Sequence, residues 1–141
     1  MKPPKINIRS SWYISSTAAI LILPLRWILC AIFAAGVHEL AHFFVLWFYH
    51  VPILQVEISP LGAKIHIPIL SPGQEILCAA AGPIASLMLL LLAPIAPMIA
   101  LFGLVQGIFN LLPIYPMDGG RIFRGILALA KMPRCKYNRV E

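Results

Sequence analysis

The chain has 141 residues, of which 60% are hydrophobic and only 11% are charged, and its mean hydropathy is +0.88. A soluble domain carries roughly a quarter of its residues as Asp, Glu, Lys and Arg, so this composition excludes an ordinary soluble domain and indicates a membrane protein. The net charge of +6 does not indicate nucleic acid binding, because no basic stripe with interleaved aromatic residues appears. The basic residues instead flank apolar segments, as membrane orientation requires.

The first half of the chain predicts a tail and two membrane spans. Residues 1–11 are polar and basic and contain two adjacent prolines, so we expect a short cytoplasmic tail without regular helix. Residues 12–49 are almost continuously apolar. One straight helix of this length would be about 57 Å long, nearly twice the ~30 Å hydrocarbon thickness. We therefore expect a break near Pro24, which separates a short span at about 12–25 from a longer span at about 27–49.

The second span carries two histidines four residues apart, in the sequence HELAH that begins at His38. Residues four apart on a helix lie one turn apart on one face, so the neutral imidazoles of His38 and His42 can bind one zinc ion. Glu39 beside them can act as a general base toward the attacking water. Ionisable residues at membrane depth are costly, so their presence indicates a functional site. The alternative is a helix with satisfied core histidines that spells the motif by chance.

The segment after this span has the pattern of strands. Residues 51–58 and 63–67 alternate weakly between apolar and polar residues around a turn at 59–62, which predicts a β-hairpin. An open sheet edge cannot face lipid, so the hairpin must lie at the interface or line a protein cavity. His50 and His66 are weak ligand candidates, because two histidines already satisfy the helical geometry, and we expect His66 to be solvated.

The second half of the chain predicts two further spans and an amphipathic helix. A span at about 74–93 is rich in small residues, which let helices approach closely in lipid. The next span, about 98–112, is followed by two prolines three residues apart and a Gly-Gly pair. These residues should not continue a helix, so we expect Asp118 on an irregular loop. Residues 121–132 are amphipathic and predict a helix lying at the lipid headgroups.

The basic residues predict the orientation of the spans. Three of them near the N-terminus and six between Arg121 and Arg139 place both termini in the cytoplasm, and Lys64 places the hairpin on the same side. Four crossings satisfy this distribution. His42 then lies about 10 Å from the cytoplasmic end of its span. Asp118 approaches from the same side, so the candidate ligands meet at one level.

Two of these segments resemble the motifs of the site-2 protease family of intramembrane zinc metalloproteases, particularly its compact sporulation-type members. The resemblance covers roughly residues 20–130, and the paired motifs are its most specific part. The element from Gly82 to Ser86 is similar to a third family element, Gly-x-x-x-Asn/Ser/Gly, with Ser in place of the commoner Asn. The two principal motifs are His38-Glu39-Leu40-Ala41-His42 and Asn110-x-x-Pro113-x-x-Pro116-x-Asp118-Gly119-Gly120.

The resemblance implies a function and a role for each motif residue. The chain would hydrolyse a peptide bond in or next to a transmembrane segment of a single-span or membrane-tethered protein substrate in the cell membrane, and a regulatory membrane partner is compatible with this. One zinc ion is the implied cofactor. The implied roles are zinc binding by His38, His42 and Asp118, general base catalysis by Glu39, and substrate positioning by Asn110, Gly82 and Ser86.

The sequence thus predicts a mainly α, multi-pass membrane protein with about four transmembrane helices and a short membrane-associated β-hairpin. Its expected parts are the tail 1–11, an intramembrane metalloprotease core at 12–132 and a basic cytoplasmic tail at 133–141. Two alternatives belong to other classes. A catalytically inactive membrane adaptor of the same fold would need neither Glu39 nor Asp118. A metal-permeating channel would place metal-binding side chains at several depths, whereas these meet at one.

Overall fold

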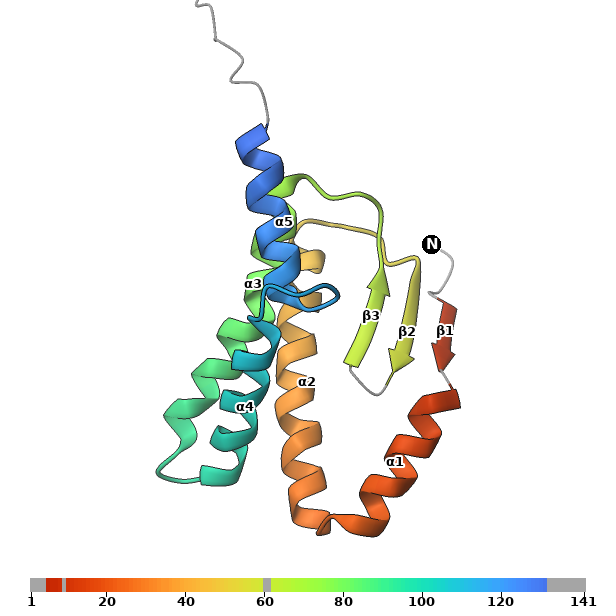
Figure 1. Ribbon diagram of the computed structural model, residues 1–141, viewed down its shortest axis with the longest axis vertical. Helices are drawn as coiled ribbons and strands as arrows, with labels where there is room; N and C mark the ends of the chain where they lie inside the picture. Colours follow the sequence, from red (N-terminus) through yellow and green to blue (C-terminus); the bar gives the residue numbers. More distant parts are fainter. Residues whose placement is uncertain (1–4, 9, 60–61, 132–141) are drawn as a thin grey trace, which may run out of the picture.

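The computed structural model describes residues 5–8, 10–59 and 62–131, and the protein is mainly helical, as predicted. Helices α2, α3, α4 and α5 pack on one another, while α1 and a small sheet stand to one side of α2 (Figure 1). The elements in chain order are β1 (Lys5–Ile8), α1 (Ser10–Ile22), α2 (Leu25–Phe48), β2 (Gln55–Ser59), β3 (Gly62–His66), α3 (Pro72–Met88), the 3-10 helix η1 (Leu89–Leu92), α4 (Pro97–Asn110) and α5 (Asp118–Lys131).

The predicted break near Pro24 is confirmed. α1 ends at Ile22, and α2 begins at Leu25 with Pro24 as its N-cap residue. The ring of Pro24 removes one backbone donor, but its carbonyl accepts the first bond of the new helix from the Trp27 N–H at 2.9 Å. The two helices diverge from this corner, so α1 leaves the bundle and turns back toward the sheet (Figure 1).

The two alternating segments are strands β2 and β3, which pair antiparallel with Gln55 opposite His66 and Ser59 opposite Gly62. The predicted turn at 59–62 includes residues 60 and 61, which lie outside the described part of the chain. The sheet order is β1-β2-β3. Among the described strands, β3 therefore has a neighbour on one side only, and its other edge faces the helices (Figure 1).

The expected N-terminal tail is corrected by β1, because Lys5–Ile8 pairs in parallel with β2. Lys5-Ile6-Asn7-Ile8 alternates polar and apolar residues, which suits a strand at a sheet edge. The adjacent prolines exclude a helix but precede this strand, so they leave its pairing intact. The partner of a four-residue strand is set by the overall fold. The local sequence therefore does not reveal that residues 5–8 pair with β2.

Two of the described helical segments are long and apolar enough to cross a membrane. They are Leu25–Phe48, which is 24 residues long, and Pro72–Leu92, which is 21 residues long. Pro97–Asn110 is apolar but shorter. α3 starts with a capping box in which Ser71 and Gln74 exchange hydrogen bonds, two residues before the predicted start of its span.

The bundle is packed through small residues, while large apolar side chains point outward. Ala34, Ala79 and Ala100 are almost fully buried. Leu40 and Leu91 are more than half exposed, and many other large apolar residues are exposed too. Helices in lipid gain little from burying apolar surface against each other and associate through close van der Waals packing. This distribution is the one expected for helices surrounded by lipid.

Asp118 does not lie on an irregular loop, which corrects the sequence prediction. It is the first residue of α5, and Gly119 and Gly120 form the first turn of that helix. A Cβ on Gly119 would lie 2.1 Å from the carbonyl oxygen of Leu111. The glycines therefore let the start of α5 pack against the preceding backbone, and the helix end places Asp118 more firmly than a loop would.

α5 is amphipathic as predicted, but it packs along α3 and continues in the direction of the bundle (Figure 1). Gly125 lies at this contact, where a Cβ would come within 2.6 Å of the Ile76 side chain. The helix that carries Asp118 is therefore fixed to the helix that packs beside the two histidines of α2.

Candidate metal site

Three side chains from two distant segments converge in the interior of the bundle. His38 and His42 come from α2, Asp118 comes from the first turn of α5, and the three residues are 3%, 7% and 7% exposed. The two Nε2 atoms lie 3.1 Å apart, and Asp118 Oδ2 lies 3.2 Å from that of His38 and 3.1 Å from that of His42. The sequence-predicted ligand set is thus brought together at one point.

The spacing of these atoms fits a tetrahedral metal ion. Ligands at zinc bond lengths of 2.0–2.1 Å and tetrahedral angles are separated by about 3.3 Å, and the three observed separations lie within 0.2 Å of that value. Two imidazole nitrogens and one carboxylate oxygen are also typical of catalytic zinc, which keeps a fourth position open. The donor set therefore fits one zinc ion.

The hydrogen bond of His42 indicates which ring nitrogen faces Asp118. Its Nδ1 lies 2.7 Å from the carbonyl oxygen of Cys78. A carbonyl only accepts, so Nδ1 carries the proton, and in the neutral ring Nε2 presents a lone pair. That lone pair points at the Asp118 carboxylate, which also has only lone pairs to offer. A metal ion between the two groups removes this repulsion, as would a proton on Nε2.

Helix α3 supplies the contacts that orient both imidazoles. His38 Nδ1 and Ser86 Oγ form a buried hydrogen bond of 2.9 Å, and the Cys78 carbonyl holds His42 two turns earlier on α3. Such outer contacts fix the tautomer and the orientation of a metal-binding histidine. The sequence did not predict the Cys78 contact, because a backbone carbonyl carries no residue signature.

Gly82 lies between these two contacts and leaves room for the rings. A Cβ at Gly82 would lie 2.2 Å from His42 Nε2 and 2.7 Å from His38 Nε2, closer than real Cβ contacts allow. Gly82 and Ser86 thus touch the histidines directly. Their predicted role in substrate positioning stays a prediction, alongside this observed contact with the metal site.

Asp118 is oriented by a chain of charges on its other side. Arg121, one turn along α5, places Nη1 3.4 Å from Asp118 Oδ1, while Oδ2 faces the histidines. Arg121 Nε also lies 4.0 Å from Glu75 Oε1 on α3, and Arg124 donates to the same carboxylate oxygen. This hydrogen bond with Glu75 raises the pKa of the Arg124 guanidinium above its ordinary value. The sequence analysis missed this network, although Asp118 and Arg121 at i, i+3 on a helix were the available signal.

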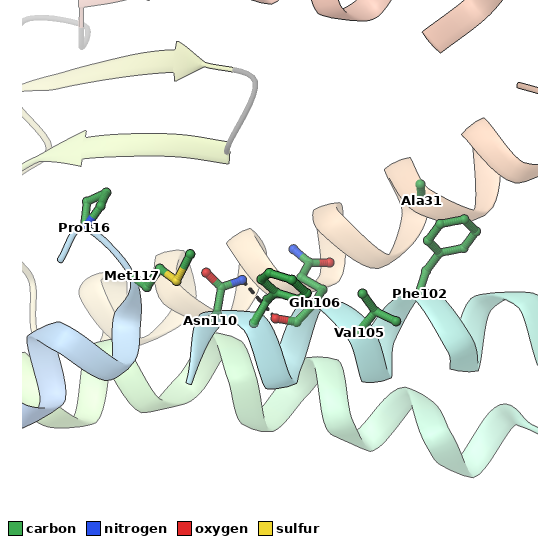
Figure 2. Close-up of a pocket in the computed structure, with 8 residues that line it drawn as sticks. Ala31, Phe102, Val105, Gln106, Asn110, Pro116 and Met117 are labelled. Atoms are coloured by element: carbon green, nitrogen blue, oxygen red, sulfur yellow. Dashed lines mark hydrogen bonds between the residues drawn. The ribbon is translucent and has the colours of Figure 1, made fainter. Parts of the chain in front are cut away.

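Glu39, Asn110 and His50 are not among the three converging donors. Glu39 follows His38 on α2 and is half-buried. Asn110 ends α4, where its Nδ2 donates to the Gln106 carbonyl at 3.1 Å, and it lines a cavity that also includes Met117, the residue before Asp118 (Figure 2). His50 follows α2 with a φ of 54°, and it is not part of the metal-binding group found among the described residues. The His66 side chain lies outside the described part.

Three comparisons with known proteins found similar proteins. Peptidase family M50 matches residues 92–140. A zinc metalloprotease from Methanocaldococcus jannaschii is 33% identical over 105 residues, which is 64% of this chain and 31% of that protein. The solved structure of a site-2 protease from the same organism superposes with a TM-score of 0.74 at 24% identity, covering 89% of this chain and 68% of that one. These matches confirm the resemblance to the site-2 protease family.

The match to the site-2 protease structure supports the fold over 89% of this chain. The curated relative is itself named a zinc metalloprotease. The chain spans 31% of the length of that curated relative. The three side chains that converge in the bundle, His38, His42 and Asp118, can hold one metal ion, as the predicted cofactor requires. These matches and the geometry of the three donors favour a metal site over a chance motif with satisfied core histidines.

Proposed function

We propose that this protein is an intramembrane zinc metalloprotease that hydrolyses a peptide bond in or next to a transmembrane segment of a membrane protein. The observation that carries the proposal is the buried group of His38, His42 and Asp118, with donor atoms 3.1–3.2 Å apart, beside Glu39 on the same helix. This group lies in a bundle whose outer surface is apolar. Hydrolysis is therefore organised at membrane depth.

Each residue has a defined task in this proposal. His38, His42 and Asp118 hold zinc, which when bound supplies a Lewis acid for the scissile carbonyl and lowers the pKa of the attacking water. Glu39 takes the proton from that water and then gives it to the leaving amine. Ser86 and the Cys78 carbonyl keep the two imidazoles in the orientation that binding needs.

The sheet offers a place for an extended substrate segment. A transmembrane helix hides its carbonyls in intrahelical hydrogen bonds, so it must unwind before its backbone can react. Its freed backbone groups can pair with an open strand edge. β3 has such an edge on the side of the helices, and both views show the segment between α4 and α5 reaching toward this strand (Figures 1 and 2).

The proposed orientation places both termini, β2 and β3 on the cytoplasmic side, with four crossings. The basic residues of the chain support it. The pairing of β1 with β2 supports it separately, because it holds the N-terminal segment in the same sheet as residues 55–59. His42 lies six residues before the end of α2, or about 9 Å from it. The site would then open toward the cytoplasm from the core at 12–132, and residues 133–141 would form a basic cytoplasmic tail.

A test compares the zinc-loaded protein in liposomes with the same sample treated with a chelator. Candidate single-span membrane proteins are added by co-reconstitution, and fragments are identified by mass spectrometry. We expect cleavage within or beside a span, loss of cleavage with the chelator, and recovery when zinc is restored. A protein that holds zinc but cleaves none of the candidates would support the alternative of an inactive adaptor and contradict the proposal.

A further inference from the structure

A cavity of about 370 Å³ lies along α4. At one end is Met117, the residue before Asp118, and at the other are Ala31 of α2 and Phe102 of α4 (Figure 2). Ala31 precedes His38 by two helical turns on nearly the same face, about 10 Å along the axis. The cavity therefore connects the residue next to Asp118 with a residue on the face of α2 that carries His38.

Two amide side chains stand in this otherwise apolar cavity. Gln106 and Asn110 are one turn apart on α4 and lie on the same side of the helix (Figure 2). Asn110 uses Nδ2 to donate to the Gln106 backbone carbonyl. The amide of Gln106 makes no side-chain hydrogen bond within the described residues, and neither does the Oδ1 atom of Asn110. Both side chains are half-buried.

An amide without a hydrogen-bond partner is unfavourable in such a place. A polar group left without a partner is costly in a lipid-like environment, and the Gln106 side chain lines the cavity. Leu or Ile would line the cavity at lower cost. The Gln106 amide therefore points to a bound group that offers hydrogen bonds at this position.

We propose that Gln106, together with Asn110, binds the unwound backbone of a transmembrane substrate next to the scissile bond. An intact helix satisfies its own backbone groups and has none to offer in its interior. An unwound segment presents both N–H and C=O groups, and a Gln amide can accept from one and donate to the other. The apolar lining receives the side chains of the same segment. The inference rests on the proposed function, since it names the substrate state that the site selects.

The test measures binding without cleavage, in the zinc-loaded Glu39→Gln protein. The probes are two fluorescent, lysine-flanked Leu-Ala transmembrane peptides in lipid nanodiscs, one with a central Gly-Gly pair that favours unwinding and one with Ala-Ala. Fluorescence anisotropy gives their dissociation constants. We expect tighter binding of the Gly-Gly peptide. Gln106→Met should reduce the ratio of the two dissociation constants about tenfold, on the scale of one or two lost hydrogen bonds.

A second variant fills the cavity from the facing helix. Ala31→Leu should weaken binding of the Gly-Gly peptide without loss of zinc. Ile108→Met on α4 and Ile32→Leu on α2, at exposed positions outside the cavity, are the matched controls and should change nothing.

Three results would overturn the inference. One is an unchanged ratio in Gln106→Met, and another is loss of zinc in that variant, which would make the amide part of the scaffold. The third is equal binding of both peptides by the parent protein. Failure of the proposed function is a different result: the protein with Glu39 intact would cleave nothing while this binding preference remained.

Discussion

At the scale of single residues, each of the three donors at the metal site has a second contact that fixes its direction. Ser86 holds His38, the Cys78 carbonyl holds His42, and Arg121 holds the second oxygen of Asp118. These contacts hold the donor atoms 3.1–3.2 Å apart. Two predictions follow from this arrangement, one on chemistry and one on metal affinity.

Glu39→Gln tests whether Glu39 is needed for cleavage or for zinc binding and folding. Glutamine keeps the size of the side chain but cannot accept the proton in the way a carboxylate does. We expect zinc content and membrane insertion to stay the same, while cleavage falls by about 10² or more, the usual scale for a lost general base. Metal analysis and a cleavage assay on one preparation check both. Cleavage at the parent rate in a zinc-loaded variant would show that Glu39 is not the base.

Arg121→Met should weaken zinc binding by about 10- to 100-fold, because outer contacts to a ligand have effects of this size. The variant keeps the length of the side chain but releases Asp118 Oδ1. Arg124→Met is the matched control, since Arg124 also contacts Glu75 but has no recorded contact with Asp118. Competition with a fluorescent zinc chelator gives both affinities. Equal affinities would mean that the backbone of α5 alone positions the carboxylate.

At the scale of elements, α3 packs against the helices that carry the three donors and contacts both histidines. It contacts α2, α4 and α5, and its residues Cys78, Gly82 and Ser86 lie against the histidines. Small residues on α3 are therefore needed for the site as well as for helix packing.

Gly82→Ala should abolish zinc binding, because the added Cβ would collide with the Nε2 atoms of both histidines. Gly36→Ala on α2 is the control, since a Cβ there meets nothing within 4 Å. It should bind zinc normally and gain slightly in helix stability, by up to about 1 kcal/mol. The measurement is the zinc content of each purified variant. Full zinc occupancy in Gly82→Ala would show that the imidazole rings of His38 and His42 can move aside.

The sequence predicts some of these elements well and others poorly. His38 and His42 are predictable because helical spacing is local, and the break at Pro24 follows from the covalent geometry of proline. The start of α5 at Asp118 was missed, since the glycines that usually end helices here serve a close approach to Leu111. β1 was missed as well, because the partner of a short strand is set by the whole fold.

At the scale of the whole molecule, the sheet and the charges both bear on the proposed orientation. The sheet joins the N-terminal segment to β2 and β3, α2 runs toward the end of the bundle from which β2 and β3 follow, and α3 runs back in the opposite direction (Figure 1). α1 has 13 residues and is about 20 Å long, shorter than the ~30 Å core. Loop and terminal positions are therefore the informative places to test the orientation.

Single cysteines at Lys5, Lys64 and Lys131, in a variant without the native cysteines, should all react only from the cytoplasmic side. Residues 5 and 64 lie in one sheet and should therefore face the same side of the membrane. Residue 131 lies at the basic end of α5, which should face the cytoplasm. A membrane-impermeant maleimide applied to intact cells and then to inverted vesicles makes the comparison. Labelling of any of the three in intact cells would contradict the four-crossing arrangement.

The metal centre also has an order of assembly that follows from its ligands. Asp118 is 80 residues after His38 in the chain, and it comes from the last described helix. Chains are synthesised and inserted from the N-terminus, so a growing chain holds two paired imidazoles long before it has the carboxylate. Until α5 docks on α3, such a chain lacks its third ligand and the rigid cradle for zinc. The proposed centre therefore becomes complete only when α5 is in place.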